Sequence, residues 1–191
     1  MASEETVEIV AYDPAWPMKF EEEEQLLRLG LAPWLVGPIE HIGSTAIPGL
    51  AAKPVIDIMA GVQTLEISRP AIQAAAQLGY CYAPYRPEAE HWFCKPSPFF
   101  RTHHLHLVPI ETPEWHRPIA FRDYLRNHST AAAEYEALKR RLARKFHLDR
   151  ERYTSAKRPF IEQITSLAME ELQGQGDVRT KNRRRSDSRR S

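Results

Sequence analysis

The sequence predicts a mixed α/β domain with a helical C-terminal third, and three observations support this. Two short apolar runs, residues 39–42 and 55–59, flank a turn, and the second is rich in the β-branched residues that favour buried strands. The alanine-rich residues 71–78 follow them and have the composition of a helix. After Arg117, apolar residues recur at helical spacing. Strands and helices in this order are typical of a sheet that packs against helices.

The composition indicates one globular domain. The chain has 191 residues, of which 42% are hydrophobic and 27% charged, enough for a substantial core. No apolar run reaches the length of a membrane span, and the N-terminus lacks the basic and apolar regions of a signal peptide. We therefore expect a cytoplasmic protein without a membrane partner. Cys81 and Cys94 form no C-x-x-C pair, so neither a zinc knuckle nor a disulfide framework is indicated.

The first half of the chain predicts two helices and a strand pair around the turn. An amphipathic helix is expected over residues 21–35. A second is expected over residues 71–78, with Ser68 as its N-cap. Residues 80–82 and 91–94 resemble strands on either side of a polar turn, and their Tyr and Trp rings would line either a base pocket or the core.

The C-terminal part predicts helices. One is expected over residues 121–127 and another over residues 131–146, with Ser129 as the N-cap of the second. Asp149 is expected to cap the last helix.

The turn between the two apolar runs has the composition of a ligand-binding loop. Gly43 leaves the backbone open to a ligand, and Ser44 and Thr45 add hydroxyls beside main-chain N–H groups that suit phosphate oxygens. Asp57 is the single charge within the following strand, where an unpaired carboxylate is costly to desolvate. Two interpretations stay open: Asp57 forms a binding site with the turn, or it braces the turn from inside the fold.

A second candidate segment is the histidine-rich strand predicted at residues 101–109. Side chains alternate in a strand, so His104 and His106 share one face while Leu105 and Leu107 take the other. Two imidazoles on one face can bind a transition metal, exchange protons or donate hydrogen bonds to phosphate. An isolated H-x-H pattern is a weak metal signal, so phosphate or substrate contact is favoured.

Several motifs resemble those of one known family. Residues 40–58, which read EHIGSTAIPGLAAKPVIDI, closely resemble the GrpB family, whose fold belongs to the nucleotidyltransferase superfamily. The other similar segments are residues 101–108, residues 121–126, Tyr135 with Leu138 and Lys139, and Tyr153 with residues 157–161. The resemblance implies a nucleotidyltransferase-like mixed sheet flanked by helices, in a single domain of residues 1–172. A similar domain is fused to dephospho-CoA kinase in some bacteria, which indicates nucleotide metabolism.

The superfamily pattern also implies a metal site, from which this sequence departs. Nucleotidyltransferases of this kind carry Asp-x-Asp or Asp-x-Glu after the Gly-Ser turn and a third carboxylate on a neighbouring strand. These acids hold two divalent ions that align the attacking hydroxyl with the phosphates. Here Met59 replaces the second acid, and His106 stands where the third is expected. The resemblance thus implies Asp57 and His106 as catalytic and metal-binding residues, with Mg²⁺ or Mn²⁺ expected before Zn²⁺, although one carboxylate is a poor set for two magnesium ions.

Substrate contacts are expected from the turn, from the histidine strand and from basic side chains. These residues are Gly43, Ser44, Thr45, Lys53, Arg101, His104, Arg122 and Lys157. The basic members would neutralise phosphate charge. Lys157 is the strongest candidate among them, because it lies in a segment that matches the family and a helix can direct it toward a cleft beside the sheet.

The sequence therefore predicts a protein that binds a nucleotide or another phosphorylated small molecule, with transfer of a nucleotidyl or phosphoryl group as the expected reaction. Two alternatives stay open. One is a catalytically inactive module that senses or carries a nucleotide, as the missing carboxylates suggest. The other is a metal-dependent hydrolase that uses Asp57 with His104 and His106.

The end of the chain differs in charge from the rest. The net charge is +1, but the chain from Asp177 onward holds seven Arg or Lys and two Asp. Residues 173–191 are rich in Gly, Arg and Ser and predict a disordered basic tail. Binding of nucleic acid is expected only through this tail.

Overall fold

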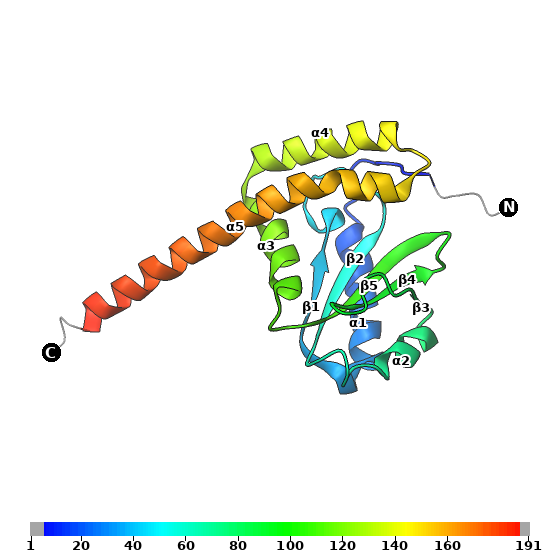
Figure 1. The fold of residues 1–191 in the computed structure, drawn as a ribbon, viewed down its shortest axis with the longest axis horizontal. Helices are drawn as coiled ribbons and strands as arrows, with labels where there is room; N and C mark the ends of the chain where they lie inside the picture. Colours follow the sequence, from blue (N-terminus) through cyan, green and yellow to red (C-terminus); the bar gives the residue numbers. More distant parts are fainter. Residues whose placement is uncertain (1–5, 188–191) are drawn as a thin grey trace.

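A computed structural model describes residues 6–187, which form a mixed α/β fold around a five-stranded sheet (Figure 1). The strands are β1 (Leu35–Ile42), β2 (Ile56–Val62), β3 (Cys81–Tyr82), β4 (His91–Pro96) and β5 (Arg101–Pro109). Their order in the sheet is β1-β2-β5-β4-β3. Strands β2 and β5 pair in parallel, and the other neighbours are antiparallel. The predicted fold class is confirmed.

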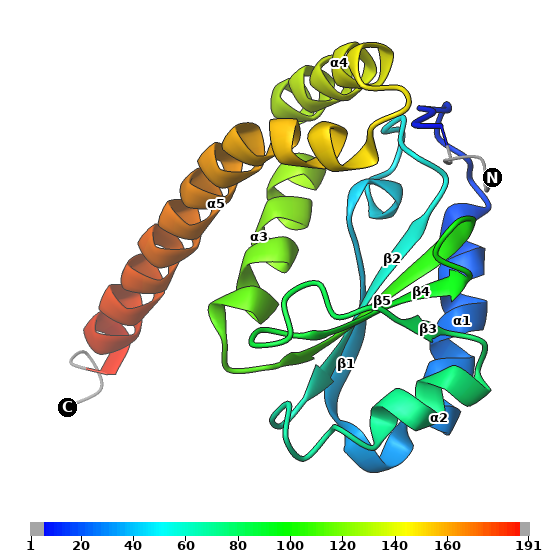
Figure 2. The same cartoon turned by 45° about the vertical axis from the view of Figure 1, so that its right-hand side comes forward.

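Helices cover both faces and one end of the sheet (Figures 1 and 2). They are α1 (Trp16–Gly30), α2 (Ala71–Gln77), α3 (Pro113–Asn127), α4 (Ser129–Lys145) and α5 (Arg150–Asp187), with short 3₁₀ turns η1 (Ala32–Trp34) and η2 (Ser44–Ala46). Helices α1 and α2 pack on one face, and α3 packs on the other. Helices α4 and α5 lie over the end of the sheet where β1 leaves for η2 and β2 begins.

The alternation of side chains along β2 separates the two faces. Ile56 and Ile58 lie in the main core with Trp16 and Leu27 of α1. Met59 points to the opposite face, where it packs with Trp115 of α3. Asp57 shares that second face with Met59, because residues two apart in a strand lie on the same side. The main core therefore closes one face of the sheet, and the polar residue of β2 lies on the other.

Most predicted elements are present, but their starting points differ. Helix α1 begins at Trp16, because Pro17 in its first turn suits a helix start. Ser68 does not cap α2 with its side chain; its hydroxyl donates to the carbonyl oxygen of Thr64 at 2.7 Å. Helix α3 begins at Pro113, before the predicted residue 121.

The two caps predicted for the C-terminal helices have different outcomes. Ser129 is the first residue of α4 rather than its cap, and His128 holds the cap position. Asp149 does cap α5, since its Oδ1 accepts the backbone N–H of Arg152 at 2.9 Å.

Helix α5 continues to Asp187, so the backbone of residues 173–187 is helical where the sequence predicts a disordered tail. The unfavourable step in forming a helix is its first turn. Residues 173–187 avoid this step because they continue a helix that is already packed, and each adds to an existing series of hydrogen bonds. Figure 1 shows this part of α5 running away from the sheet. The rest of the predicted tail, residues 188–191, lies outside the described residues. None of the helices within residues 6–187 is both long and apolar enough to cross a membrane.

Candidate functional site

Asp57 and His104 form a hydrogen-bonded pair on the face of the sheet that α3 partly covers. They are direct partners in the parallel pairing of β2 and β5, and the distance from His104 Nδ1 to Asp57 Oδ1 is 2.8 Å. Burial raises the pKa of Asp57, but the hydrogen bond with His104 and the charges of His104, His106 and Lys157 lower it, and the net pKa lies below the ordinary value. Asp57 is therefore an ionised carboxylate whose side chain is 29% exposed.

The Gly43 turn lies directly against this carboxylate. Gly43 has φ +72°, and a Cβ placed on it would lie 2.3 Å from Asp57 Oδ2. The sequence indicates that the missing side chain of Gly43 leaves space for a ligand. In the structure the Asp57 carboxylate occupies this space. The next residue, Ser44, is half-buried, and its side chain hydrogen-bonds to Tyr135 of α4. The turn, the acid and α4 thus meet at one end of the sheet.

Two lysines lie near Asp57, and Arg101 lies near one of them. Lys157 of α5 is half-buried, with its ammonium 4.4 Å from the centre of the Tyr153 ring. Burial lowers the pKa of Lys157 to about 8, with Asp57 opposing the shift and Lys53 adding to it. Burial also lowers the pKa of Lys53, with the charge of Arg101 in the same direction and that of Asp57 in the other. Each lysine therefore lies close enough to Asp57 and to another cation to be affected by both charges.

His104 is oriented by more than the carboxylate. Its ring lies 5.0 Å from that of Trp92, and the guanidinium of Arg101 lies 5.2 Å from the same Trp92 ring. The Nε2 atom of His104 is buried and has no hydrogen-bond partner among residues 6–187. Burial lowers the pKa of His104, and the hydrogen bond and charge of Asp57 oppose this shift.

His106, predicted as a catalytic and metal-binding residue, does not contact Asp57. It is the sheet partner of Met59, and its Nδ1 lies 2.5 Å from Oε2 of Glu90. Glu90 is 3% exposed and also accepts a hydrogen bond from Arg86 at 2.9 Å. Burial raises the pKa of Glu90, but His106 and Arg86 lower it to about 2. Glu90 was missed from the sequence, where a Glu in a polar turn carries no sign of burial.

Helix α4 contributes Tyr135 and Lys139, which were noted only as family-like positions. Lys139 is 1% exposed, donates a hydrogen bond to the carbonyl oxygen of Ala51, and lies with its ammonium 4.8 Å from the centre of the Tyr135 ring. Burial lowers the pKa of Lys139 to about 7, and the charge of Lys157 adds to the shift. Both residues therefore lie next to the Asp57 site. The feature of the sequence that marks them is the Tyr135, Leu138, Lys139 motif.

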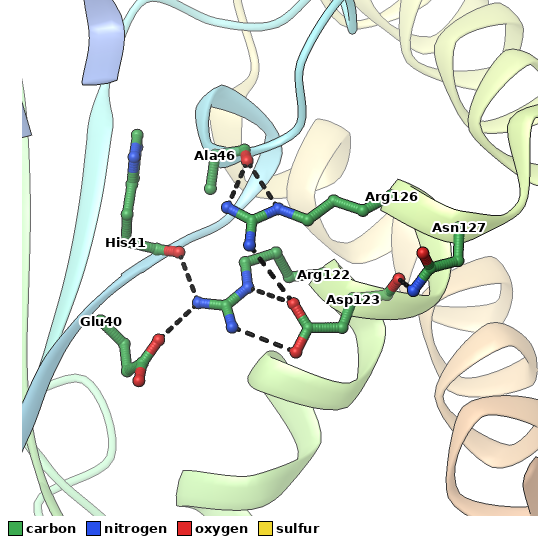
Figure 3. Close-up of polar contacts among 7 residues, drawn as sticks. All are labelled: Glu40, His41, Ala46, Arg122, Asp123, Arg126 and Asn127. Carbon is green, nitrogen blue, oxygen red and sulfur yellow. Dashed lines mark hydrogen bonds and ion pairs between the residues drawn. The ribbon is translucent and has the colours of Figure 1, made fainter. Parts of the chain in front are cut away.

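Two residues predicted as substrate contacts take part in hydrogen-bond networks within the fold. Thr45 is 1% exposed and donates to the carbonyl oxygen of Val55 at 3.1 Å. Arg122 of α3 is 2.6 Å from Glu40, 2.7 Å from Asp123 and 3.0 Å from the carbonyl oxygen of His41 (Figure 3).

The neighbouring Arg126 belongs to the same network as Arg122. It donates to the carbonyl oxygen of Ala46 at 3.0 and 2.7 Å (Figure 3). These contacts join α3 to β1 and η2.

The side chains present do not form a ligand set for a metal ion. Within residues 6–187, no three His, Cys, Asp or Glu side chains come together in a group that could hold one. Asp57 accepts from His104 and His106 is paired with Glu90, so the two predicted metal ligands are engaged with different partners. A two-ion site of the superfamily kind needs several carboxylates on one centre, and Asp57 contributes one.

A second feature is a pocket between the segment after the turn and helices α3 and α4. It is lined by residues 47–50, by Leu125 and Arg126 of α3 and by Ala132 and Glu136 of α4. Asp57, His104 and Lys157 are not among its lining residues. The charged cluster and this pocket are therefore separate features of the same end of the sheet.

Comparison with known proteins identifies the family. The family model described as GrpB protein matches residues 6–167. A UPF0157 protein of Pseudomonas aeruginosa is 38% identical over 172 residues, 88% of this chain and 70% of that protein. The UPF0157 protein YqkA of Bacillus subtilis is 37% identical over 137 residues, and the match spans 72% of this chain but only 40% of that longer protein.

The fold is also that of a solved structure. The crystal structure of conserved protein GrpB from Enterococcus faecalis is similar with a TM-score of 0.79 and 34% sequence identity, over 86% of this chain and 99% of that one. The chain belongs to the GrpB family.

Proposed function

We propose that this protein binds a phosphorylated small molecule, with a nucleotide as the first candidate, at the face of the sheet that carries Asp57. One observation carries the proposal: Lys157 and Lys53 both lie close enough to the Asp57 carboxylate, which accepts a hydrogen bond from His104, for its charge to affect them, and Arg101 lies close enough to affect Lys53. The site therefore brings basic side chains close to one another and to an ionised carboxylate.

An anion would relieve the electrostatic cost of this arrangement. Partly buried cations that repel one another are destabilised, as the lowered pKa values of Lys157 and Lys53 indicate. A phosphate group carries up to two negative charges and accepts several hydrogen bonds, so it matches two lysines and an arginine better than a carboxylate does. The Ser44 hydroxyl, which hydrogen-bonds to Tyr135 in the turn next to Gly43, offers a further polar contact for the same group.

Transfer of a nucleotidyl or phosphoryl group is the reaction that the likeness to nucleotidyltransferases suggests. In such a step the lysines and Arg101 would offset negative charge on the phosphate, and His104, held by Asp57, would orient the acceptor. Mg²⁺ or Mn²⁺ stays an expectation from the resemblance. No step is assigned to it, because the side chains around Asp57 do not form a ligand set.

Binding without catalysis is the second candidate, and a specific observation favours it. Met59 takes the place of the second acid and is 1% exposed, packed against α3. A module that senses or carries a nucleotide needs the cationic cluster but not the acid. Turnover assays on the bound compound separate these two functions. A transferase should turn the compound over and lose this activity in Asp57→Asn while still binding it, whereas a binding module should show no turnover in either protein.

A ligand screen tests the proposal. Melting temperature is measured with nucleotides, CoA precursors and sugar phosphates, each with and without Mg²⁺, Mn²⁺ and Zn²⁺, because a compound that binds the native state raises it. We expect Lys157→Met to weaken the best compound about 10-fold, the loss of roughly one charged contact.

Lys145→Met is the matched control for this screen, since Lys145 is exposed, lies 5.2 Å from the Phe146 ring and is not among the groups that shift the pKa of Asp57. Its affinity should equal that of the wild type. A screen in which no phosphorylated compound raises the melting temperature, or in which both variants bind equally well, contradicts the proposal.

A further inference from the structure

We infer that Cys81 and Cys94 are a modification site, at which a small disulfide or peroxide oxidant closes a reversible cross-strand disulfide. The two residues are direct partners in the antiparallel pairing of β3 and β4. Both thiols are free in the structure. This inference does not depend on the proposed ligand or on any reaction at Asp57.

The register brings the two sulfur atoms to the same face of the sheet. Directly opposed residues in antiparallel strands share a face, and their Cα atoms are about 4.5 or 5.5 Å apart, depending on the type of pair. Two positions along, Ala83 N–H donates to the carbonyl oxygen of Trp92 at 3.0 Å, so Cys81 and Cys94 form the wider, hydrogen-bonded kind of pair. A spacing of about 5.5 Å lies within the range of roughly 4.4 to 6.8 Å that disulfides span.

The two thiols differ in accessibility, which sets the order of events. Cys94 has no exposed surface, and burial raises its pKa, with Arg101 opposing the shift and Cys81 adding to it. Cys81 is half-buried and lies on β3, the edge strand, where its Sγ is 3.5 Å from the carbonyl oxygen of Pro96. An oxidant therefore reaches Cys81 first, and Cys94 acts as the resolving thiol.

Glutathione disulfide, a small disulfide oxidant, can form this bond in two exchange steps. The Cys81 thiolate attacks one sulfur of glutathione disulfide and forms a mixed disulfide, and one glutathione thiolate leaves. Cys94 then loses its proton and attacks the Cys81 sulfur, which forms the internal S–S bond and releases the second glutathione. The protein loses two protons and two electrons, and the oxidant gains them to become two thiols.

The bond should be readily reduced rather than a permanent crosslink. The Cβ atoms of a hydrogen-bonded pair are farther apart than a relaxed disulfide requires, so β3 has to move toward β4. Strand β3 can do this because it has two residues and a single neighbour in the sheet. Strained or exposed disulfides have higher reduction potentials and exchange readily with thiols.

The cysteine pair lies in the same row of paired sheet residues as the candidate ligand site. The register gives one row across all five strands, formed by Ile42, Asp57, His104, Cys94 and Cys81 in that order. Cys94 is thus the direct neighbour of His104 on the same face. A disulfide that pulls on Cys94 acts one strand away from the Asp57–His104 pair.

Mass spectrometry of the full-length protein tests the inference. The protein is reduced, freed of reductant and incubated with glutathione disulfide, and remaining thiols are alkylated after unfolding. We expect both cysteines to become protected together, with a mass two hydrogens below the reduced form and a peptide that links residues 81 and 94. Excess reduced glutathione should restore both thiols.

Two variants identify the order of events. Cys94→Ser should stop at one glutathione on Cys81, and Cys81→Ser should leave Cys94 fully alkylated after unfolding. The inference is overturned if the wild-type protein ends as a glutathione adduct without the internal bond or does not react. It is equally overturned if Cys94 reacts as fast in Cys81→Ser as in the wild type.

Discussion

The Asp57 carboxylate fills the space that a side chain at Gly43 would need. The separation between the would-be Cβ and Asp57 Oδ2 is 2.3 Å, far inside van der Waals contact. Gly43 also has φ +72°, a conformation that residues with a Cβ rarely adopt. The turn and the acid of the next strand therefore depend on each other, and this dependence can be measured.

Gly43→Ala should destabilise the protein more than Gly49→Ala. Gly49 has nearly the same φ, +77°, but nothing lies within 4 Å of its would-be Cβ, so its substitution reports backbone strain alone. We expect a loss of about 1 kcal/mol in the free energy of unfolding for Gly49→Ala and of about 3 kcal/mol for Gly43→Ala, the difference coming from the displaced carboxylate. Urea denaturation measures both. Equal losses would show that Asp57 moves aside freely and does not depend on the turn.

The approach of the acid to the turn was predictable, because its signals are local. The β-branched run marks β2 as a buried strand, and the Gly-Ser-Thr turn precedes it closely in sequence. The face shared by His104 and His106 was predictable for the same reason, since alternation follows from strand geometry.

The choice between the two histidines was not predictable. Which imidazole meets Asp57 depends on the register between β2 and β5, and 47 residues separate Asp57 from His104 in the chain. That register is set by the packing of the whole connection, and neither strand encodes it alone. A shift of two residues would have joined Asp57 to His106.

The contact of Arg122 with Glu40 was not predictable, for a related reason. Its partner Glu40 is 82 residues away in sequence, and the FRDYLR motif does not distinguish a phosphate-binding arginine from one that joins two elements. Tertiary contacts of this kind leave no periodic pattern.

Arg122→Met should reduce stability without affecting ligand binding in the folded fraction. The substitution leaves Glu40 and the carbonyl oxygen of His41 without their donor in a largely buried place, where the Arg122 side chain is 9% exposed. We expect a loss of about 3 kcal/mol, typical of removing one partner from a buried ion pair. Arg117→Met on the exposed side of the same helix is the control and should change the free energy of unfolding by less than about 0.5 kcal/mol.

Affinity for the compound found in the ligand screen gives the second measurement for Arg122. Below the melting temperature, the folded Arg122→Met protein should bind it as the wild type does. A large loss of affinity with unchanged stability would instead return Arg122 to the substrate-binding residues that the sequence indicated.

His41 should make the protein less stable as the pH falls from 6.5 to 4. Burial lowers the pKa of His41 to about 4, with the charges of Arg126 and Arg122 adding to the shift and that of Asp57 opposing it. The ring is stacked on Phe20 at 4.7 Å between centroids. Between pH 6.5 and 4 the unfolded chain therefore binds a proton at His41 that the folded chain does not, so stability is fully present above 6.5 and falls with pH through this window.

His41→Gln should remove this part of the pH dependence. One such proton contributes a slope of up to about 1.4 kcal/mol per pH unit, so the free energy of unfolding of the variant should fall less steeply by up to that amount between pH 6.5 and 4. Above pH 7 the two proteins should show parallel profiles, because the imidazole is then neutral in both states. Glutamine can keep a hydrogen bond to the Thr45 hydroxyl, which lies 3.0 Å from His41 Nε2. A loss of packing in the variant would lower the free energy of unfolding equally at every pH, whereas loss of the titrating group changes only the slope. Identical slopes below pH 6.5 would mean that the buried imidazole is protonated as readily in the folded protein as in the unfolded chain.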